Sequence, residues 1–226
     1  MIEMFKKAGM GISEKQREQF QTLFEFMVEY NKNVNLTSIT EFEDVVMKHF
    51  IDSVLPFYML KISGNESFID VGTGAGFPGL PLLICFPNLR GTLCDSLAKR
   101  CTYLEQACQK IGVNAEVIHA RSEELGRTRR ERYDFATARA VAAMPVLTEL
   151  CLPFVKVGGG FIALKSVNED IAQADNAIKF LGGKLIRTED YKLPNGDDRR
   201  LAVVKKISQT PTKYPRNYAN ISKNPL

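Results

Sequence analysis

A glycine-rich run that directly follows a short apolar stretch constrains this chain more than any other feature. Residues 70–76 read Asp-Val-Gly-Thr-Gly-Ala-Gly; they follow Phe68-Ile69 and precede the apolar residues 77–84. Glycine allows positive φ angles and lets a ligand approach the backbone closely, and the first turn of a helix has unpaired N–H groups. The pattern therefore predicts a buried strand, a tight turn and a helix that together hold a nucleotide-type cofactor.

From this run onward, strand-like and helix-like patterns alternate, which predicts an α/β doubly wound sheet. The last two strand patterns are separated by the turn-forming residues 194–197, so we expect a terminal antiparallel hairpin on a seven-stranded, mostly parallel sheet. The expected strands cover residues 67–71, 91–94, 115–119, 133–138, 160–164, 184–193 and 201–207. The expected helices of the core cover residues 79–84, 97–111, 141–154 and 169–181.

Two helices are expected before the sheet begins. Ser13 and Gln16 have the spacing of a capping box, which starts an amphipathic helix over residues 13–31. A second helix is expected from Thr40, with Glu43 completing another capping box and Pro56 bending it. We therefore divide one compact domain into an N-terminal helical cap (1–62), a cofactor-binding core (63–208) and a basic C-terminal tail (209–226).

Composition narrows the class of protein. The chain has 226 residues, 45% of them hydrophobic, and a formal net charge of +4, which suits one sizeable and mildly basic domain. No apolar stretch reaches the roughly 20 residues that span a bilayer, so no membrane role is expected. Five scattered cysteines without a C-x-x-C pair, and two histidines, argue against a metal site and suit a reducing cytoplasm. Cys101 and Cys108, two helical turns apart, are expected on a buried helix face.

The register of the glycines separates two classes of cofactor. Asp95 ends the second strand about 20 residues after the glycine turn, where a carboxylate can bind ribose hydroxyls in either class. A dinucleotide fingerprint counted from Gly72 requires glycine at position 77, which is Phe77. A literal match from Gly74 starts late and includes Pro78. The register D-x-G-x-G-x-G instead resembles the first motif of the Rossmann-like class I S-adenosylmethionine-dependent methyltransferases, with an NAD(P)-dependent oxidoreductase as the alternative.

Further motifs narrow the resemblance to one family. They are residues 70–79, Leu93-Cys94-Asp95-Ser96 with Lys99-Arg100, Arg139-Ala140-Val141-Ala142, residues 210–216, Asn35-Leu36-Thr37 and His49-x-x-Asp52-Ser53. Together they resemble the ribosomal RNA small subunit methyltransferase G family, also called glucose-inhibited division protein B. The resemblance implies S-adenosylmethionine as cofactor and methylation of guanine N7 in 16S rRNA, at conventional position 527. Ser166, Ala219 and Ile221 depart from the family pattern, which has glycine, glycine and proline there.

The resemblance also implies a set of site residues. The expected cofactor contacts are Gly72, Gly74, Phe77, Asp95, Ser96, Ser122, Glu123 and Arg139. We assign no general base, because guanine N7 has a free lone pair at neutral pH. Arg139, His49, Asn35 and Lys165 are candidates for positioning the reactants. Structural roles, such as hydrogen-bonded helix positions or caps, are the alternative for His49, Asn35 and Asp52, and we expect Glu124 to be solvated.

RNA binding must come from basic surface. The expected contacts are Lys99, Arg100, Lys213, Tyr214, Arg216 and Lys223, because basic residues of the tail alternate with aromatics that can stack on bases. Arg127, Arg129, Arg130 and Arg132 form either a further RNA contact or a solvated loop. The expected partner is 16S rRNA, a small ribosomal subunit or an assembly intermediate, bound by a monomer. An RNA-binding assembly factor on a vestigial methyltransferase fold is the alternative from another class, and truncation after Ser208 is expected to spare cofactor binding.

Overall fold

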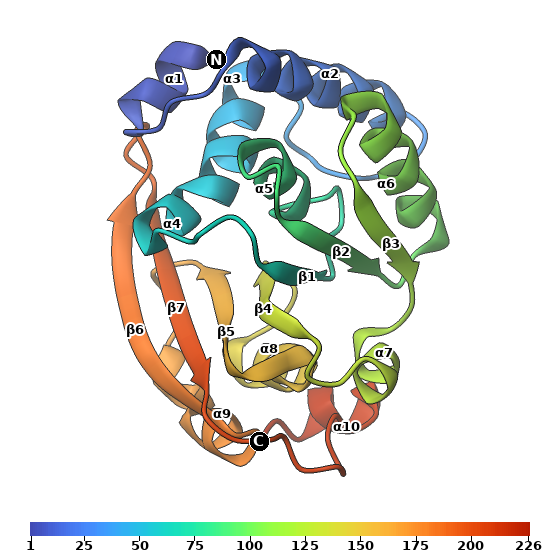
Figure 1. Cartoon of the computed structure of the whole chain (residues 1–226), viewed down its shortest axis with the longest axis vertical. Coiled ribbons are helices and arrows are strands. Elements are labelled where there is room, and N and C mark those ends of the chain that lie inside the picture. The colour runs from blue at the N-terminus through green and yellow to red at the C-terminus, as the bar shows by residue number, and fades with distance from the viewer.

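The computed structural model describes residues 1–226 and contains one seven-stranded sheet (Figure 1). Its strand order is β3-β2-β1-β4-β5-β7-β6, and β7 runs antiparallel to both of its neighbours. The strands are β1 (Ser67–Val71), β2 (Arg90–Asp95), β3 (Ala115–His119), β4 (Tyr133–Arg139), β5 (Val155–Lys165), β6 (Gly183–Lys192) and β7 (Asp198–Lys206). The predicted α/β class, strand number and terminal hairpin are therefore confirmed, with β5 beginning earlier than expected.

Helices cover both faces of the sheet, and each face has its own apolar core. One core joins the N-terminal helices to α5 (Gly79–Cys85) and α6 (Ala98–Ile111). The other core lies under α7 (Ser122–Thr128), α8 (Met144–Cys151), the short turns η2 (Leu152–Phe154) and η3 (Ile171–Ala174), α9 (Asp175–Phe180) and α10 (Tyr218–Lys223). The central strand β1 is buried from Phe68 to Val71, including the carboxylate of Asp70, as expected for a parallel strand covered on both faces. The predicted helix at 141–154 is split into α8 and η2, and that at 169–181 into η3 and α9.

The N-terminal segment contains α1 (Ile2–Lys7), α2 (Glu14–Asn31), α3 (Phe42–Val45), the π-helical turn η1 (Val46–Ile51) and α4 (Asp52–Leu60). The capping box of Ser13 and Gln16 is confirmed at the start of α2. The second predicted capping box is wrong, because α3 begins at Phe42 with Glu41 as its N-cap residue. This start puts Glu43 one position too early to reach back to the N-cap N–H. Pro56 lies inside α4.

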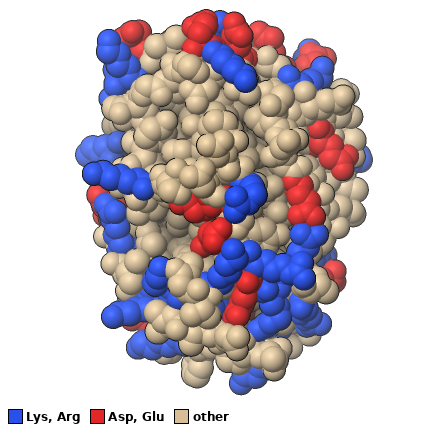
Figure 2. All heavy atoms as spheres, in the orientation of Figure 1, with Lys and Arg blue, Asp and Glu red and all other residues tan.

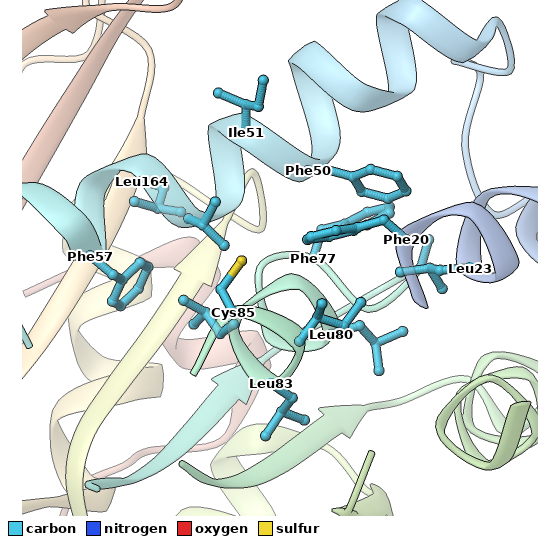
Figure 3. Close-up of a cluster of buried hydrophobic side chains, with 14 of the residues drawn as sticks. Phe20, Leu23, Phe50, Ile51, Phe57, Phe77, Leu80, Leu83, Cys85 and Leu164 are labelled. Atoms are coloured by element: carbon cyan, nitrogen blue, oxygen red, sulfur yellow. The ribbon is translucent and has the colours of Figure 1, made fainter. Parts of the chain in front are cut away.

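Aromatic side chains join the cap to the glycine loop (Figure 3). The ring centroids of Phe20 on α2 and Phe50 on η1 lie 4.8 Å apart, and those of Phe50 and Phe77 lie 6.1 Å apart. All three side chains are at most 5% exposed. Because Phe77 follows the glycine run directly, burial of these rings places the cap over one end of that loop.

The C-terminal tail, predicted as a basic segment that contacts RNA, is a packed part of the fold. Tyr214 is 6% exposed, and Ile221, one of the departures from the family pattern, is fully buried. Arg130 donates hydrogen bonds to the carbonyl oxygens of Thr210 and Tyr214, so this arginine is used inside the protein. Arg129 of the same cluster pairs with Glu116 instead. The tail therefore depends on the core for its position.

The structure also shows where the cysteines lie and whether any helix or side-chain cluster could span a membrane or hold a metal ion. All five cysteines are buried and reduced, and Cys101 and Cys108 lie on the buried face of α6, as predicted. No helix has both the length and the apolar character needed to cross a bilayer. The side chains of His, Cys, Asp and Glu nowhere gather in a group of three or more that could hold a metal ion.

Candidate functional site

The glycine loop borders a cleft of about 490 Å³ at the carboxyl end of β1. Gly72, Gly74 and Gly76 all have positive φ angles, of 68°, 61° and 91°. A Cβ on Gly72 would lie 2.8 Å from Cγ2 of Val141, whereas a Cβ on Gly74 would meet no atom within 4 Å. The loop therefore needs glycine for its backbone at both positions, and at Gly74 it presents bare backbone to open space.

The side chain of Asp70, on β1, fixes the shape of the glycine loop. Its Oδ2 accepts hydrogen bonds from Oγ1 of Thr73 at 2.6 Å and from the backbone N–H of Gly79 at 2.8 Å. Complete burial raises the pKa of Asp70 to about 6, because the charged form loses its hydration. A Cβ on Gly79 would lie 2.3 Å from Cδ2 of Leu93, so this glycine allows α5 to pack closely on β2.

Asp95, at the end of β2, joins the loop to the middle of the cleft. Its Oδ2 accepts a hydrogen bond from the N–H of Gly74 at 3.0 Å, and its Oδ1 accepts one from the N–H of Leu97 at 2.9 Å. Arg100 lies 3.5 Å from Oδ2 and also lines the cleft, although we expected it on RNA. Ser96 lines the same wall. Each carboxylate oxygen has a second lone pair with which Asp95 can accept a hydrogen bond from a ligand hydroxyl.

One end of the cleft, which we call the outer end, is formed by Ser122 and Glu123 at the start of α7, with Leu150 on α8 and Tyr218 on α10. Glu123 is buried and Glu124 is exposed, as expected for this pair. Sequence reasoning assigned neither Leu150 nor Tyr218 to the cofactor site. Nothing local in the sequence links either residue to the glycine loop, because they reach the cleft through the packing of α8 and the tail.

The opposite end, which we call the inner end, is formed by Phe77, His49 and Arg139. The ring of His49 stacks on that of Phe77, with centroids 4.6 Å apart, and the Arg139 guanidinium lies 5.2 Å from the Phe77 centroid. Nη2 of Arg139 lies 3.1 Å from Nδ1 of His49. Arginine can only donate, so Nδ1 accepts in this contact, and in that tautomer Nε2–H donates to Oγ1 of Thr37 at 2.8 Å. The carbonyl oxygen of Lys48, 3.2 Å from Nδ1, then receives no hydrogen from His49 and is served by Nη1 of Arg139. Burial and the charge of Arg139 lower the pKa of His49 to about 3.

Arg139 is fixed by a network that reaches three elements. Its Nη1 donates to the carbonyl oxygen of Lys48 at 3.0 Å and to Oδ2 of Asp52 at 3.1 Å. Nε of Arg199, on β7, donates to Oδ1 of the same carboxylate at 3.1 Å. Burial raises the pKa of Asp52, and the two guanidinium groups oppose that shift. Asp52 thus joins the helical cap to β4 and β7, a positioning role that the sequence left open.

A second cavity of about 670 Å³ meets the cleft at His49, Arg139, Ala140 and Val141. The ammonium group of Lys165, on the far wall, donates to the carbonyl oxygen of Ala142 at 2.5 Å and lies 2.9 Å from Oε1 of Glu169. The same oxygen of Glu169 accepts the N–H of Met144 at 2.6 Å. These bonds hold residues 140–143 in place, and Ala140 and Val141 of this segment line both cavities.

Three of the predicted site residues lie elsewhere. Asn35 is exposed and lines neither cavity, whereas its neighbours Leu36 and Thr37 line the cleft. Tyr214 is buried, and Nη2 of Arg216 lies 2.6 Å from Oε2 of the fully buried Glu149. The ion pair anchors the tail on α8, and Tyr214 belongs to the apolar core on that face of the sheet. Lys99, Lys213 and Lys223 are exposed, as RNA contacts must be.

The chain is similar to one family of known proteins. The family model described as rRNA small subunit methyltransferase G matches residues 16–200. The chain is 45% identical over 224 residues to a ribosomal RNA small subunit methyltransferase G of Streptococcus pyogenes serotype M12 (strain MGAS2096), covering 96% of this chain and 94% of the relative. It is 46% identical over 227 residues to the protein of the same name from Alkaliphilus metalliredigens (strain QYMF), covering 98% and 95%.

Solved structures show the class of fold. A Burkholderia thailandensis 1,6-didemethyltoxoflavin-N1-methyltransferase, solved with bound S-adenosylhomocysteine, matches with a TM-score of 0.57 and 11% identity. The match covers 88% of this chain and 92% of that one. The sheet described above is therefore that of the class I S-adenosylmethionine-dependent methyltransferases.

Proposed function

The chain belongs to the rRNA small subunit methyltransferase G family, and we propose that it transfers the methyl group of S-adenosylmethionine to N7 of a guanine in 16S rRNA. Family membership supports methylation of rRNA with this cofactor. The choice of guanine N7 and of 16S rRNA is our proposal. The observation that carries it is the meeting of two cavities at Arg139 and His49, beside the glycine loop.

The residues of the cleft fit S-adenosylmethionine. Bare backbone at Gly74 leaves room for the amino acid portion, and Asp95 offers free lone pairs to ribose hydroxyls in the middle of the cleft. Ser122 and Leu150 flank the outer end, where a planar apolar base such as adenine fits. When bound, this cofactor supplies a methyl group on a positively charged sulfur. We propose that the sulfur end lies at the inner end, near Phe77.

The second cavity suits the acceptor base. It opens beside Arg139 and is lined by further polar side chains, including Lys165, Glu169 and Arg199. A base that enters from this side meets the inner end of the cleft at the shared residues His49 and Arg139. The acceptor atom and the donor can then approach in line, which is the geometry that methyl transfer requires.

The protonation states at the inner end agree with an acceptor that needs no base. His49 stays neutral at physiological pH, because its pKa is about 3, and both of its ring nitrogens already have partners. Arg139 uses both Nη1 hydrogens and one Nη2 hydrogen inside the protein. Its Nε–H and its other Nη2–H are free to donate to guanine O6, which adjoins N7. We propose that Arg139 positions the base in this way and leaves the N7 lone pair free.

Basic surface beside the cleft is our proposed RNA-binding region. Figure 2 shows Lys and Arg side chains, with Asp and Glu side chains among them, around a hollow near the middle of this face and over the region where α7 and α10 lie in Figure 1. Lys99 on α6 and Lys213 and Lys223 of the tail are exposed. Because phosphate contacts release counterions, binding should weaken steeply as salt concentration rises.

Calorimetry and methyl transfer together test the proposal. We expect S-adenosylhomocysteine to bind and NADH not to bind; binding of NADH alone would instead indicate an oxidoreductase. With labelled S-adenosylmethionine, we expect transfer to small-subunit particles or to their naked rRNA. Tight RNA binding without transfer to either substrate would indicate an assembly factor on a vestigial fold.

A matched pair of variants tests the role of Asp95 in that assay. Asp95→Ala removes a charge-assisted hydrogen bond worth about 1.5–3 kcal/mol and should weaken S-adenosylhomocysteine binding about 10–100-fold. Asp190→Ala, which removes an exposed carboxylate on β6 that pairs with Arg200, is the control and should bind as the wild type does. Equal affinity in both variants would exclude Asp95 from the cofactor site.

A further inference from the structure

Tyr218 presents an unused aromatic ring to the outer end of the cleft. It is the first residue of α10, is 41% exposed, and lines the same cleft as Ser122 and Leu150. Its ring packs against no other aromatic ring, and its hydroxyl makes no hydrogen bond within the protein. An exposed aromatic face at the rim of a cleft favours contact with a planar group of a ligand.

The segment that carries Tyr218 is firmly held. Arg216 pairs with the buried carboxylate of Glu149. The neighbouring Pro215 lies against Gly126 on α7, so closely that a Cβ added to that glycine would be 3.2 Å from Cγ of the proline. The side chain of Asn217 caps the N–H of Asn220 at 3.0 Å, and Ile221 is fully buried. These contacts lie on both sides of Tyr218, so its place at the rim is set before any ligand binds.

The position of Tyr218 along the cleft selects the part of the cofactor that it meets. Phe77 and Ile221 belong to the cores on opposite faces of the sheet, so the inner end and the tail lie on opposite sides. Asp95, between them, is placed for the ribose. The base attached to that ribose then extends toward Ser122, Leu150 and Tyr218.

We infer that the ring of Tyr218 covers the adenine of the bound S-adenosyl cofactor, so that the C-terminal tail completes the cofactor site. This inference rests on the proposed function and adds to it a specific contact. It also reverses the expectation that truncation after Ser208 spares cofactor binding, because that truncation removes Tyr218.

Titration of S-adenosylhomocysteine into matched variants tests this contact. Stacking of an aromatic ring on a base is worth about 1–3 kcal/mol, so Tyr218→Ala should weaken binding about 5-fold or more. Tyr218→Phe keeps the ring and should stay close to the wild type. Phe180→Ala, which removes a 60% exposed ring outside the cleft, is the control. The same loss with 5′-methylthioadenosine would assign the contact to the adenosine portion.

Tyrosine fluorescence gives a second readout, because the chain has seven tyrosines and no tryptophan. Adenine stacked on Tyr218 should quench part of this emission in the wild type, and Tyr218→Phe should lose that quenching while it still binds. Wild-type protein that fails to bind S-adenosylhomocysteine would overturn the proposed function. Wild-type binding that Tyr218→Ala matches, with equal thermal stability, would overturn the inference about Tyr218 alone.

Discussion

The two ends of the cleft are built on different principles. At the inner end, both ring nitrogens of His49 and both Nη atoms of Arg139 have partners within the protein, and the ring of Phe77 stacks on that of His49. At the outer end, Ser122 is half-buried and Tyr218 has an unpartnered ring. Under the proposed function, a hydrogen-bonded network would position the reacting groups, whereas the base of the cofactor would meet a rim at which the Tyr218 ring is 41% exposed.

The largest effect, on the stability of the protein, is expected from the ion pair that attaches the outer end of the cleft to α8. Arg216→Ala leaves Glu149 buried without its cationic partner, which should lower the free energy of unfolding by about 3–5 kcal/mol. Cofactor affinity should also fall, because Tyr218 loses its support. Denaturant unfolding and calorimetry measure both effects.

The double variant Glu149→Leu/Arg216→Met is the informative control for this pair. Replacing a buried ion pair with apolar side chains of similar volume is often neutral, so it should regain most of the lost stability. If Arg216→Ala alone unfolds like the wild type, the tail is not anchored as we describe.

The next largest effect tests the closed network of the inner end. Arg139→Lys keeps the charge but cannot contact His49 and Asp52 at once, since an ammonium group lacks the forked geometry of guanidinium. Methyl transfer should fall about 100-fold, or about 2.7 kcal/mol of barrier, while S-adenosylhomocysteine affinity changes little. Arg129→Lys, on the surface pair with Glu116, is the control. If Arg139→Lys transfers the methyl group as fast as Arg129→Lys does, charge alone matters at Arg139.

A smaller effect, on the pH dependence of stability, follows from the lowered pKa of His49. Because that pKa is about 3 in the folded protein and 6.5 in the unfolded chain, the unfolded state takes up the proton more readily. Stability from this group is therefore present near pH 7 and is lost as the pH falls, by about 2 kcal/mol between pH 7.5 and pH 5.

His49→Gln can keep both hydrogen bonds without titrating, so it should lack this part of the pH dependence. Asp70, whose raised pKa of about 6 acts in the opposite direction over the same range, contributes equally to both proteins. Denaturant unfolding across this pH range gives the comparison. Parallel pH profiles for wild type and variant would contradict a neutral, buried His49.

The smallest effect is expected on the exposed rim. Lys213→Ala and Lys223→Ala should each weaken RNA binding a few-fold. Each should also make the slope of log affinity against log salt concentration shallower by about one, as expected for the loss of one phosphate contact. Neither change should alter the affinity for S-adenosylhomocysteine. Filter binding over a salt series measures the slope, and a slope that neither variant changes would place the RNA elsewhere.

The glycine loop and Asp95 could be predicted because the residues that define them are close in sequence. The network of the inner end could not, because Asp52 meets Arg139 and Arg199 across 87 and 147 residues of chain. The tail misled sequence reasoning for another reason. Basic and aromatic residues have the same pattern in a tail that binds RNA and in one anchored on a buried acid. Only the fold reveals that Glu149 faces Arg216.

Mapping the methylated atom tests the central claim most directly. Small-subunit particles that lack the modification would be incubated with the protein and S-adenosylmethionine, and the rRNA analysed by nuclease digestion and mass spectrometry. N7-methylguanine is distinguished chemically, because reduction and amine treatment cleave the strand at that base. We predict one N7-methylguanine in 16S rRNA, formed about 100-fold more slowly with Arg139→Lys. Methylation of another base or atom would contradict the proposed function.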